Sequence, residues 1–478
     1  MTRFLIDGEL TGALAGEELP VEDPSTGEIL RSVPLGRPAD AELAISAARR
    51  AFDSGPWPQL SPAQRGAALH RLGELLEANR AEFVAYGEDE VGTARRQADA
   101  IHYSRPMDAF RDLLPKGSRS LDVGLPQLTG AVPTEQLVTR EPRGVVAVIT
   151  PWNCPQLSNI WKVVPALLTG NTVVLKPSPE APGAALALGR LALEAGLPPG
   201  VLNVVTGGAD VGEVVSSHPG VDMVSFTGSA EVGRLIMAAG APTLKRLALE
   251  LGGKSALLAL PDADPAMVAA RALRVTMGSG QICALESRLL LPESLHDDIV
   301  GRIVAAMDEV VVGSAHDDAT TMGPLITAAH LRRVQGWIES GVSSGAKIAT
   351  GGGVPSRIPA GGHYLEPTLL VDVTNDMPVA REEIFGPVLV VIRYSGDLNE
   401  GVAIANDSQY GLIGSVYGSP ENALRAARQI RSGRVAVNNA ASTSDGPFGG
   451  FKQSGIGREL GTWGLEEFTE VRHLAWPI

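Results

Sequence analysis

The sequence of 478 residues has only two cysteines, Cys154 and Cys283, and aromatic residues make up 4% of it. Two cysteines so far apart are no disulfide framework, which favours a reducing compartment. A basic excess is also missing, and the net charge of −14 argues against non-specific binding to nucleic acid. No apolar run approaches the roughly 20 residues that span a bilayer, and no signal-peptide pattern is present. We therefore expect a cytoplasmic protein with neither nucleic-acid nor membrane partners.

The rest of the composition is that of a globular protein, with 44% hydrophobic and 20% charged residues. A chain of this length is too long for one ordinary core and suits two or three domains. The eight histidines show no spacing typical of metal ligands, so no metal site is expected. No arrangement of serine, histidine and aspartate indicates a hydrolase triad either.

Short β-branched runs alternate with Ala/Leu-rich segments in the middle of the chain. The runs are VVAVIT (145–150), TVVLK (172–176), VLNVV (201–205) and MVSF (223–226). Residues 183–196 read as a helix between two of them, with Gly196 suited to its C-terminal end. This alternation predicts a parallel sheet covered on both faces, which binds ligands at the carboxyl ends of its strands.

The segments around this sheet have patterns of their own. Residues 61–90 read as a helix, and 264–280 as another, which places Cys283 just past a helix and before a strand. A second α/β segment follows. The polar stretch 120–141 reads as an arm, and 468–476 reads as an exposed strand that needs a partner.

Two motifs after strands suit a nucleotide. In FTGSAEVG (226–233), Gly228 allows a tight turn and Ser229 opens a helix, whose free amides suit a phosphate. An ordinary strand–turn–helix explains the same pattern, and the GxGxxG fingerprint is absent. Lys176 ends its strand at the edge of the sheet where ligands bind. Its side chain either reaches ribose hydroxyls or is simply solvated.

Glu250, Asn153 and Cys283 are further candidates for catalysis, each with a structural alternative. Glu250, in LELGGKS, is either ion-paired or kept for proton transfer with a raised pKa. Asn153, in PWNCP, is either an oxyanion donor or a turn residue. Cys283 and Cys154 are free cysteines, which are usually buried and inert.

Taken together, ordered motifs over almost the whole chain resemble the NAD(P)-dependent, non-phosphorylating aldehyde dehydrogenases. The resemblance begins with FLIDGEL and DPSTGE near the start of the chain and ends with FTEV near its end. The motifs between them are EPRGVVAVITPWNCP, VLKPSPE, FTGSAEVG, LELGGKS, GQIC, EEIFGPV, NDSQYGL, RVAVNN and PFGGFKQSGIGRELG. The resemblance implies an α/β fold with a Rossmann-like parallel-sheet cofactor domain, an α/β catalytic domain and a small β oligomerisation arm. The implied domains are 1–119 with 142–252 for the dinucleotide, 253–453 for catalysis, and 120–141 with 454–478 for assembly as a homodimer or homotetramer.

The resemblance also implies a reaction. Cys283 matches the nucleophile, whose thiohemiacetal with the aldehyde loses a hydride to NAD(P) and leaves a thioester. Asn153 matches the oxyanion donor, acting with the backbone amide of Cys283. Glu250 matches the base that activates water to hydrolyse the thioester. A CoA-acylating relative would lack that glutamate, and a cysteine hydrolase would need a histidine partner; these remain the alternatives.

Cofactor residues follow from the same matches. They are Trp152, Lys176, Ser178, Glu180, Gly228, Ser229, Gly252, Glu383 and Phe385. Ser229 and its helix receive the pyrophosphate, Glu383 holds the nicotinamide ribose, and Gly252 lets the ring lie close to the backbone. Pro179 stands where the family's acid is expected and moves Glu180 by one residue. We expect NAD, with NADP left open.

The implied substrate tunnel is mostly apolar. Its residues are Cys154, Leu157, Trp161, Ile282, Ala284, Ser442 and Phe448. Cys154 stands where many members have phenylalanine, which predicts a roomy tunnel for a medium-chain or aromatic aldehyde. Charged aldehydes are expected to be poor substrates, because none of the seven positions is charged. Leu285 and Glu286 replace small residues after the nucleophile, and the direction of Glu286 cannot be read from the sequence.

Overall fold

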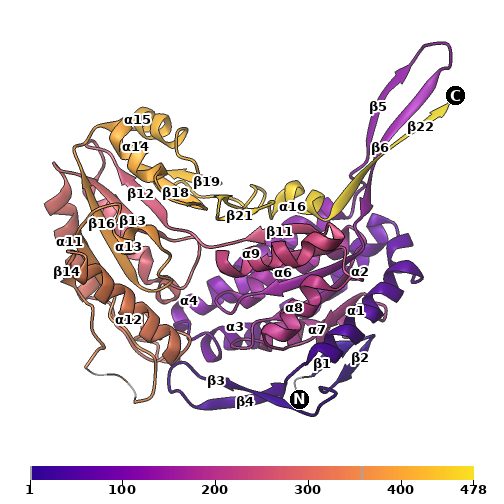
Figure 1. The fold of residues 1–478 in the computed structure, drawn as a ribbon, viewed down its shortest axis with the longest axis horizontal. Coiled ribbons are helices and arrows are strands. Elements are labelled where there is room, and N and C mark those ends of the chain that lie inside the picture. Colours follow the sequence, from indigo (N-terminus) through magenta and orange to yellow (C-terminus); the bar gives the residue numbers. More distant parts are fainter. Residues whose placement is uncertain (1–2, 357, 359) are drawn as a thin grey trace.

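The computed structural model describes residues 3–356, 358 and 360–478. Figure 1 shows two α/β lobes side by side and an arm that projects from one of them. The fold is therefore the expected one, a mixed α/β structure built on parallel sheets. The division into domains at the residues given above stays a prediction.

The first lobe contains an eight-stranded sheet in the order β2-β1-β9-β8-β7-β10-β11-β21. Its strands are β1 (Phe4–Ile6), β2 (Glu9–Thr11), β7 (Val145–Thr150), β8 (Thr172–Pro177), β9 (Leu202–Val204), β10 (Met223–Thr227), β11 (Arg246–Glu250) and β21 (Gly455–Ile456). The strands from β9 to β11 are parallel, so the predicted parallel sheet is confirmed. Every residue of β7 and β8 is buried, which shows that both faces of the sheet are covered.

Helices cover this sheet. They include α1 (Pro38–Asp53), α2 (Pro62–Ala78), α3 (Arg80–Asp89), α5 (Arg105–Gly117), α6 (Pro155–Leu168), α7 (Gly183–Glu194), α8 (Ala209–Ser217) and α9 (Ala230–Gly240). Gly196 has φ +80° and closes α7 as predicted. The single helix expected over 61–90 is two helices, because Asn79 turns its side-chain amide back to the Leu75 carbonyl (2.8 Å) and ends α2.

The second lobe contains a seven-stranded sheet in the order β14-β15-β16-β13-β12-β18-β19, parallel except for β14. Its strands are β12 (Ser255–Ala259), β13 (Glu286–Pro292), β14 (Lys347–Thr350), β15 (Thr368–Val373), β16 (Val388–Tyr394), β18 (Ile413–Tyr417) and β19 (Arg434–Val437). Its helices are α10 (Pro265–Ala272), α11 (His296–Asp308), α12 (Ala328–Ser343), α13 (Pro378–Arg381), α14 (Leu398–Asn406) and α15 (Pro420–Ala427). Apolar clusters lie on either side of the sheet.

The helix expected over 264–280 is shorter. Helix α10 ends at Ala272, and a 3₁₀ segment follows over Leu273–Gly280. Gly278 and Ser279 are left-handed there (φ +53° and +56°), and a Cβ on Gly280 would lie 2.0 Å from the carbonyl carbon of Gly386. The left-handed residues end the 3₁₀ segment, and the close approach at Gly280 requires a glycine there, shortly before Cys283.

The arm is a three-stranded antiparallel sheet, β22-β6-β5. It consists of β5 (Val123–Leu128), β6 (Thr134–Pro142) and the C-terminal β22 (Thr469–Pro477). The expected arm and tail strand are thus present, and β6 is the partner that the tail strand required. No helix in the described part of the chain is long and apolar enough to cross a membrane.

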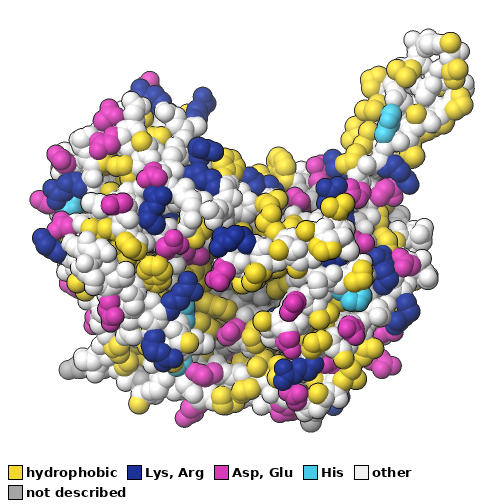
Figure 2. Space-filling view, in the orientation of Figure 1, with side chains coloured by type: hydrophobic (Ala, Val, Ile, Leu, Met, Phe, Trp, Pro, Cys, Tyr) yellow, Lys and Arg dark blue, Asp and Glu magenta, His cyan; other side chains and the backbone are white. Residues whose placement is uncertain are grey.

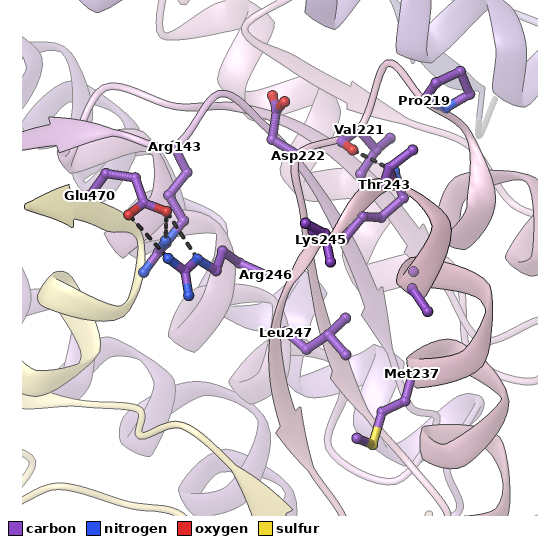
Figure 3. Close-up of a pocket in the computed structure, with 13 residues that line it drawn as sticks. Arg143, Pro219, Val221, Asp222, Met237, Thr243, Lys245, Arg246, Leu247 and Glu470 are labelled. Atoms are coloured by element: carbon purple, nitrogen blue, oxygen red, sulfur yellow. Dashed lines mark hydrogen bonds and ion pairs between the residues drawn. The ribbon is translucent and has the colours of Figure 1, made fainter.

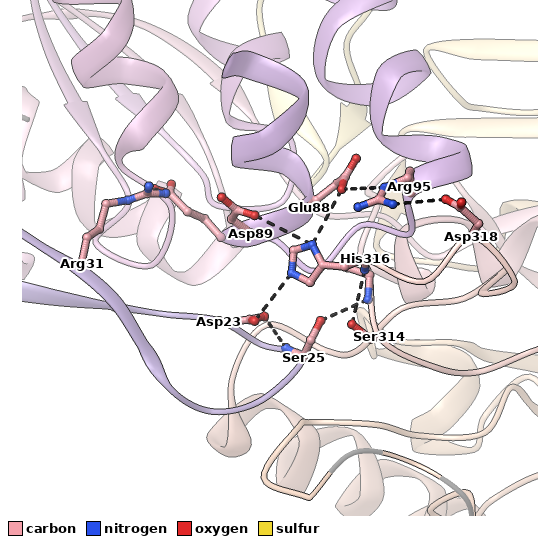
Figure 4. Close-up of polar contacts among 11 residues, drawn as sticks. Asp23, Ser25, Arg31, Glu88, Asp89, Arg95, Ser314, His316 and Asp318 are labelled. Atoms are coloured by element: carbon pink, nitrogen blue, oxygen red, sulfur yellow. Dashed lines mark hydrogen bonds and ion pairs between the residues drawn. The ribbon is translucent and has the colours of Figure 1, made fainter. Parts of the chain in front are cut away.

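Polar contacts join the two lobes. His316 of the second lobe lies 3.6 Å from the carboxylate of Asp23, 3.7 Å from that of Glu88 and 3.9 Å from that of Asp89 (Figure 4). The backbone amide of Ala315 also donates to the Ser25 hydroxyl (3.1 Å). Such contacts hold the lobes together.

Candidate functional site

The three predicted catalytic residues come from separate segments that the fold brings together. Glu250 ends β11, Asn153 precedes α6, and Cys283 lies between the 3₁₀ segment and β13. The side-chain amide of Asn153 donates to the carbonyl oxygen of Gln281 (2.8 Å), two residues before Cys283. The loop after Glu250 also lies close to Cys283, because a Cβ on Gly253 would lie 3.3 Å from the carbonyl oxygen of Cys283.

The thiol of Cys283 lies in an apolar, acidic surrounding. Burial raises its pKa well above the usual value, and Cys154, Glu383 and Glu250 raise it further. Both cysteines are free thiols. Burial also raises the pKa of the Cys154 thiol, to about 12. A thiol held in its neutral form needs a nearby proton acceptor before it can act as a nucleophile.

Glu250 is the candidate for such an acceptor. Its side chain is buried, and its Oε2 has no hydrogen-bond partner within the described part of the chain. Burial raises its pKa well above the usual value, and the nearby carboxylate of Glu459 raises it further. A buried carboxylate oxygen without a partner is costly, so such groups are typical of sites that handle protons.

A buried ion pair lies next to Glu250. Lys162 of α6 and Glu459 are paired, and both side chains are almost wholly excluded from solvent. The positive charge of Lys162 opposes the rise in the pKa of Glu250. Sequence reasoning missed this pair, although a lysine within the apolar stretch IWKVVPALL was a usable signal.

The predicted cofactor residues line the ends of β8, β10 and β11. Ser229 caps α9, with its hydroxyl accepting from the amide of Val232 (3.3 Å). Lys176 is buried, its ammonium donates to the carbonyl of Pro177 (3.1 Å), and burial lowers its pKa to about 8. The hydroxyl of Ser178 donates to the carboxylate of Glu180. Gly228 is needed for space, because a Cβ there would lie 2.3 Å from the ring of Phe226.

Glu383 approaches from the second lobe. Its carboxylate accepts from the amide of Gly253 (2.9 Å), and burial raises its pKa to about 7. A Cβ on Gly252 would lie 2.1 Å from Oε2 of Glu383. In this structure the space above Gly252 thus holds a carboxylate. The closeness of Gly252 to a nicotinamide ring stays a prediction.

Trp152 and Phe385, also predicted, pack edge to face with ring centroids 5.4 Å apart. His330 completes an aromatic cluster with them, 5.6 Å from Trp152, and its Nε2 is hydrogen-bonded to the carbonyl of Phe385 (2.7 Å). Phe385 is left-handed, with φ +60°. No motif pointed to His330, because only the fold brings α12 to this position.

Three of the seven predicted tunnel residues share an apolar cluster with Cys283. Trp161 and Phe448 pack edge to face at 5.3 Å, in one cluster with Cys283 and Ala284. Cys154 is buried, whereas Leu157 and Ile282 are half-buried. Ser442 is exposed and stands outside this cluster.

Leu285 and Glu286, which follow Cys283 and Ala284, are both buried. Glu286 is buried and paired with Arg271, with Oε1 2.5 Å from Nη2, and Leu285 is buried in the interior. The direction of Glu286, which the sequence left open, is therefore toward α10 and not toward the substrate.

A surface pocket of about 740 Å³ lies elsewhere, at the base of the arm. Figure 3 shows Arg143 and Arg246 converging on Glu470 at one side of it, with Met237 and Leu247 at the other. None of the predicted catalytic, cofactor or tunnel residues lines this pocket. It is no part of the candidate site.

Comparison with known proteins gives a consistent result. The model of the aldehyde dehydrogenase family matches residues 12–474. The chain is 42% identical to a 3-succinoylsemialdehyde-pyridine dehydrogenase of Pseudomonas sp over 98% of this chain and 97% of that protein. It is 38% identical to the betaine aldehyde dehydrogenase of Bacillus subtilis over 98% and 96%.

Solved structures agree with these relatives. An aldehyde dehydrogenase of Mycobacterium tuberculosis, complexed with NAD+, superposes with a TM-score of 0.95 at 38% identity, over 100% of this chain and 98% of that one. A betaine aldehyde dehydrogenase mutant of Staphylococcus aureus, also in complex with NAD+, gives a TM-score of 0.96 at 34% identity, over 99% and 95%.

Proposed function

This chain belongs to the aldehyde dehydrogenase family, and from that premise we propose that it oxidises a medium-chain or aromatic aldehyde to the carboxylic acid with NAD as hydride acceptor. The observation that carries the proposal is the half-buried Cys283, whose thiol pKa is raised by burial and by nearby groups that include Glu250, together with Oε2 of Glu250, which has no partner in the described chain. The test is the formation of NADH, followed by absorbance, with a panel of aldehydes. No NADH with any of them would contradict the proposal.

Cys283 begins the reaction. Loss of its proton to Glu250, directly or through water, gives the thiolate that attacks the aldehyde carbon. The carbonyl oxygen becomes an oxyanion, and in this proposal the side-chain amide of Asn153 and the backbone amide of Cys283 stabilise it. One N–H of Asn153 already bonds to Gln281, which fixes the orientation of the other.

Glu250 then completes the reaction. After the thiohemiacetal is oxidised, the acyl group remains on Cys283 as a thioester. Glu250 removes a proton from water as it attacks the thioester carbon, the carbon–sulfur bond breaks, and the acid leaves. A carboxylate with a raised pKa is a stronger base for this step than an ordinary one.

The structure has residues that fit NAD. Lys176 is buried with a backbone carbonyl as its partner, α9 presents its N-terminal amides beside Ser229, and the carboxylate of Glu383 is fixed by Gly253. We propose that Lys176 and Glu383 hold ribose hydroxyls and that Ser229 with α9 binds the pyrophosphate. Trp152, Ser178, Glu180, Gly228, Gly252 and Phe385 would complete the site. When bound, NAD accepts the hydride from the thiohemiacetal carbon. The solved relatives in complex with NAD+ support this choice.

NAD is expected to be preferred over NADP. A carboxylate near the adenine ribose accepts from its hydroxyls and repels a 2′-phosphate, and Ser178 orients the carboxylate of Glu180. The measurement is kcat/KM for each cofactor. Glu180→Gln should lower the preference for NAD, whereas Glu194→Gln, on the exposed side of α7, should leave it unchanged. A clear NADP preference of the unaltered protein would show that Glu180 does not reach the ribose.

The tunnel is expected to favour bulky aldehydes over acetaldehyde. Its apolar walls stabilise a larger substrate by about 25 cal/mol for each Å² that is buried. Cys154→Phe should lower kcat/KM for bulky aldehydes more than for acetaldehyde, and Cys154→Ala, which fills no space, should not. Thermal unfolding of both variants checks that they are folded. Equal loss on both substrates, or acetaldehyde as the best substrate of the unaltered protein, would contradict a roomy tunnel.

We also propose assembly as a homodimer or homotetramer through the arm. Figure 2 shows hydrophobic side chains gathered along it, and Val123 and Val471 are exposed by 54% and 60%. The outer strands β5 and β22 each present an edge that another subunit can cover.

A further inference from the structure

Three arginines, Arg105, Arg274 and Arg434, lie at the rim of the apolar cluster around Cys283; we call them the arginine trio. Arg105 begins α5, and Ala109, one turn later on the same face, packs in the cluster with Cys283. Ala109 is buried and Arg105 is exposed, so this face of α5 runs from the cluster outward to the surface.

The other two members come from the second lobe. Arg434 begins β19 opposite Ile413 of β18, and Ile413 belongs to the same apolar cluster. Arg274 lies in the 3₁₀ segment that leads to Cys283. The side chains of Arg274 and Arg434 are half-buried. Segments from both lobes thus bring arginines to the edge of one apolar cluster.

The charges of the trio are not balanced. Burial lowers the pKa of both Arg274 and Arg434, and neighbouring arginines, Arg105 among them, lower it further. The nearby carboxylate of Glu286 is already held by Arg271. In the described chain no member of the trio forms an ion pair. Unpaired like charges are costly where they are half-buried, as Arg274 and Arg434 are, and an anion would relieve that cost.

The backbone before Arg105 is unusual. Residues Ala100–Ser104 form a π-helical turn, a rare conformation that occurs frequently at functional sites. It ends at Arg105, where α5 begins.

We propose that the arginine trio binds a carboxylate at the end of the substrate remote from the aldehyde. Arginine pairs with carboxylates through two parallel hydrogen bonds, and the net charge of −14 makes a basic rim in this protein exceptional. One helical turn, about 5.4 Å, separates Ala109 from Arg105, which suits a substrate of medium length. The substrate class is then an ω-carboxy aldehyde or a carboxylated aromatic aldehyde.

This inference rests on the proposed function and revises the expectation that charged aldehydes are poor substrates. That expectation considered seven tunnel positions, none of them charged, and the trio lies outside those positions. Cationic aldehydes are still expected to be poor, because three guanidinium groups repel them. The substrate of the relatives named betaine aldehyde dehydrogenase is therefore not expected to suit this chain.

The test compares hexanal with adipate semialdehyde, which has a carboxylate in place of the terminal methyl group, and with betaine aldehyde. We expect kcat/KM for the semialdehyde to exceed that for hexanal by about tenfold or more, and betaine aldehyde to be the poorest of the three. Arg105→Gln and Arg434→Gln should each reduce the ratio mainly by raising KM for the semialdehyde. Arg431→Gln, an exposed arginine outside the trio, should leave the ratio unchanged.

Two results would overturn the inference. Hexanal as good a substrate as the semialdehyde, or an unchanged ratio in Arg105→Gln and Arg434→Gln, would leave the proposed function intact and show that the trio binds no carboxylate. If no aldehyde is oxidised, the proposed function fails. Adipate then tests the trio alone: it should raise the Tm of the unaltered protein more than that of Arg105→Gln, and an equal effect would contradict the inference.

Discussion

Cys283→Ala is expected to abolish aldehyde oxidation, lowering kcat/KM by roughly four orders of magnitude or more, while dinucleotide binding stays measurable. The two-step reaction depends on a thioester at Cys283, and loss of a nucleophile usually costs at least this much. Steady-state NADH formation measures the first effect. Quenching of tryptophan fluorescence by NAD measures the second, since Trp152 lies in the proposed cofactor site.

The matched control is Cys154→Ala, which removes the other cysteine and its sulfur from the same region. This variant should still oxidise aldehydes, and its kcat/KM should change only as much as a substitution in the tunnel wall would change it. Full steady-state activity in Cys283→Ala would show that Cys283 is not the nucleophile. Loss of activity in Cys154→Ala alone would transfer that role to Cys154.

Glu250→Gln is expected to give one burst of NADH followed by slow turnover. Hydride transfer precedes hydrolysis, so a variant without the base still completes the first half of the reaction and then stalls as the thioester. Proton removal from the thiol then depends on solvent, so the burst should be slower at low pH. Stopped-flow absorbance separates the burst from the slow phase, and the conservative Glu309→Gln, exposed at the end of α11, serves as control. Full steady-state turnover in Glu250→Gln would show that Glu250 is not the base.

The pH dependence of the unaltered enzyme follows from the same carboxylate. Burial and the charge of Glu459 raise the pKa of Glu250, so the group is protonated below that pKa and cannot act as a base. Turnover should therefore rise with pH through a range above that of an ordinary glutamate. The rise should be lost in Glu250→Gln.

The parallel sheet of the first lobe could be predicted because its signals are local. Runs such as 145–150 and 172–176 are short and continuously apolar, and the helices between them follow capping rules at Gly196 and Ser229. The break at Asn79 could not be predicted from the apolar pattern, because one side-chain hydrogen bond decides it.

The site was predicted less completely, for a physical reason. The motifs around Asn153 and Cys283 lie far apart in the sequence, and the resemblance to a family, rather than the residues alone, connected them. Pairings such as Lys162 with Glu459 and Glu286 with Arg271 join residues whose sequence neighbours give no sign of each other. Space requirements, such as that of Gly252 beside Glu383, likewise depend on the folded chain.

The central claim is that Cys283 carries the acyl group while Glu250 removes it, and one measurement tests it most directly. Glu250→Gln is mixed with NAD and hexanal, quenched with acid during the slow phase, and examined by intact-protein and peptide mass spectrometry. The account predicts an added hexanoyl group on the peptide that contains Cys283, at close to one per chain, which hydroxylamine removes. An unmodified protein after the burst, or a hexanoyl group on the peptide that contains Cys154, would contradict it.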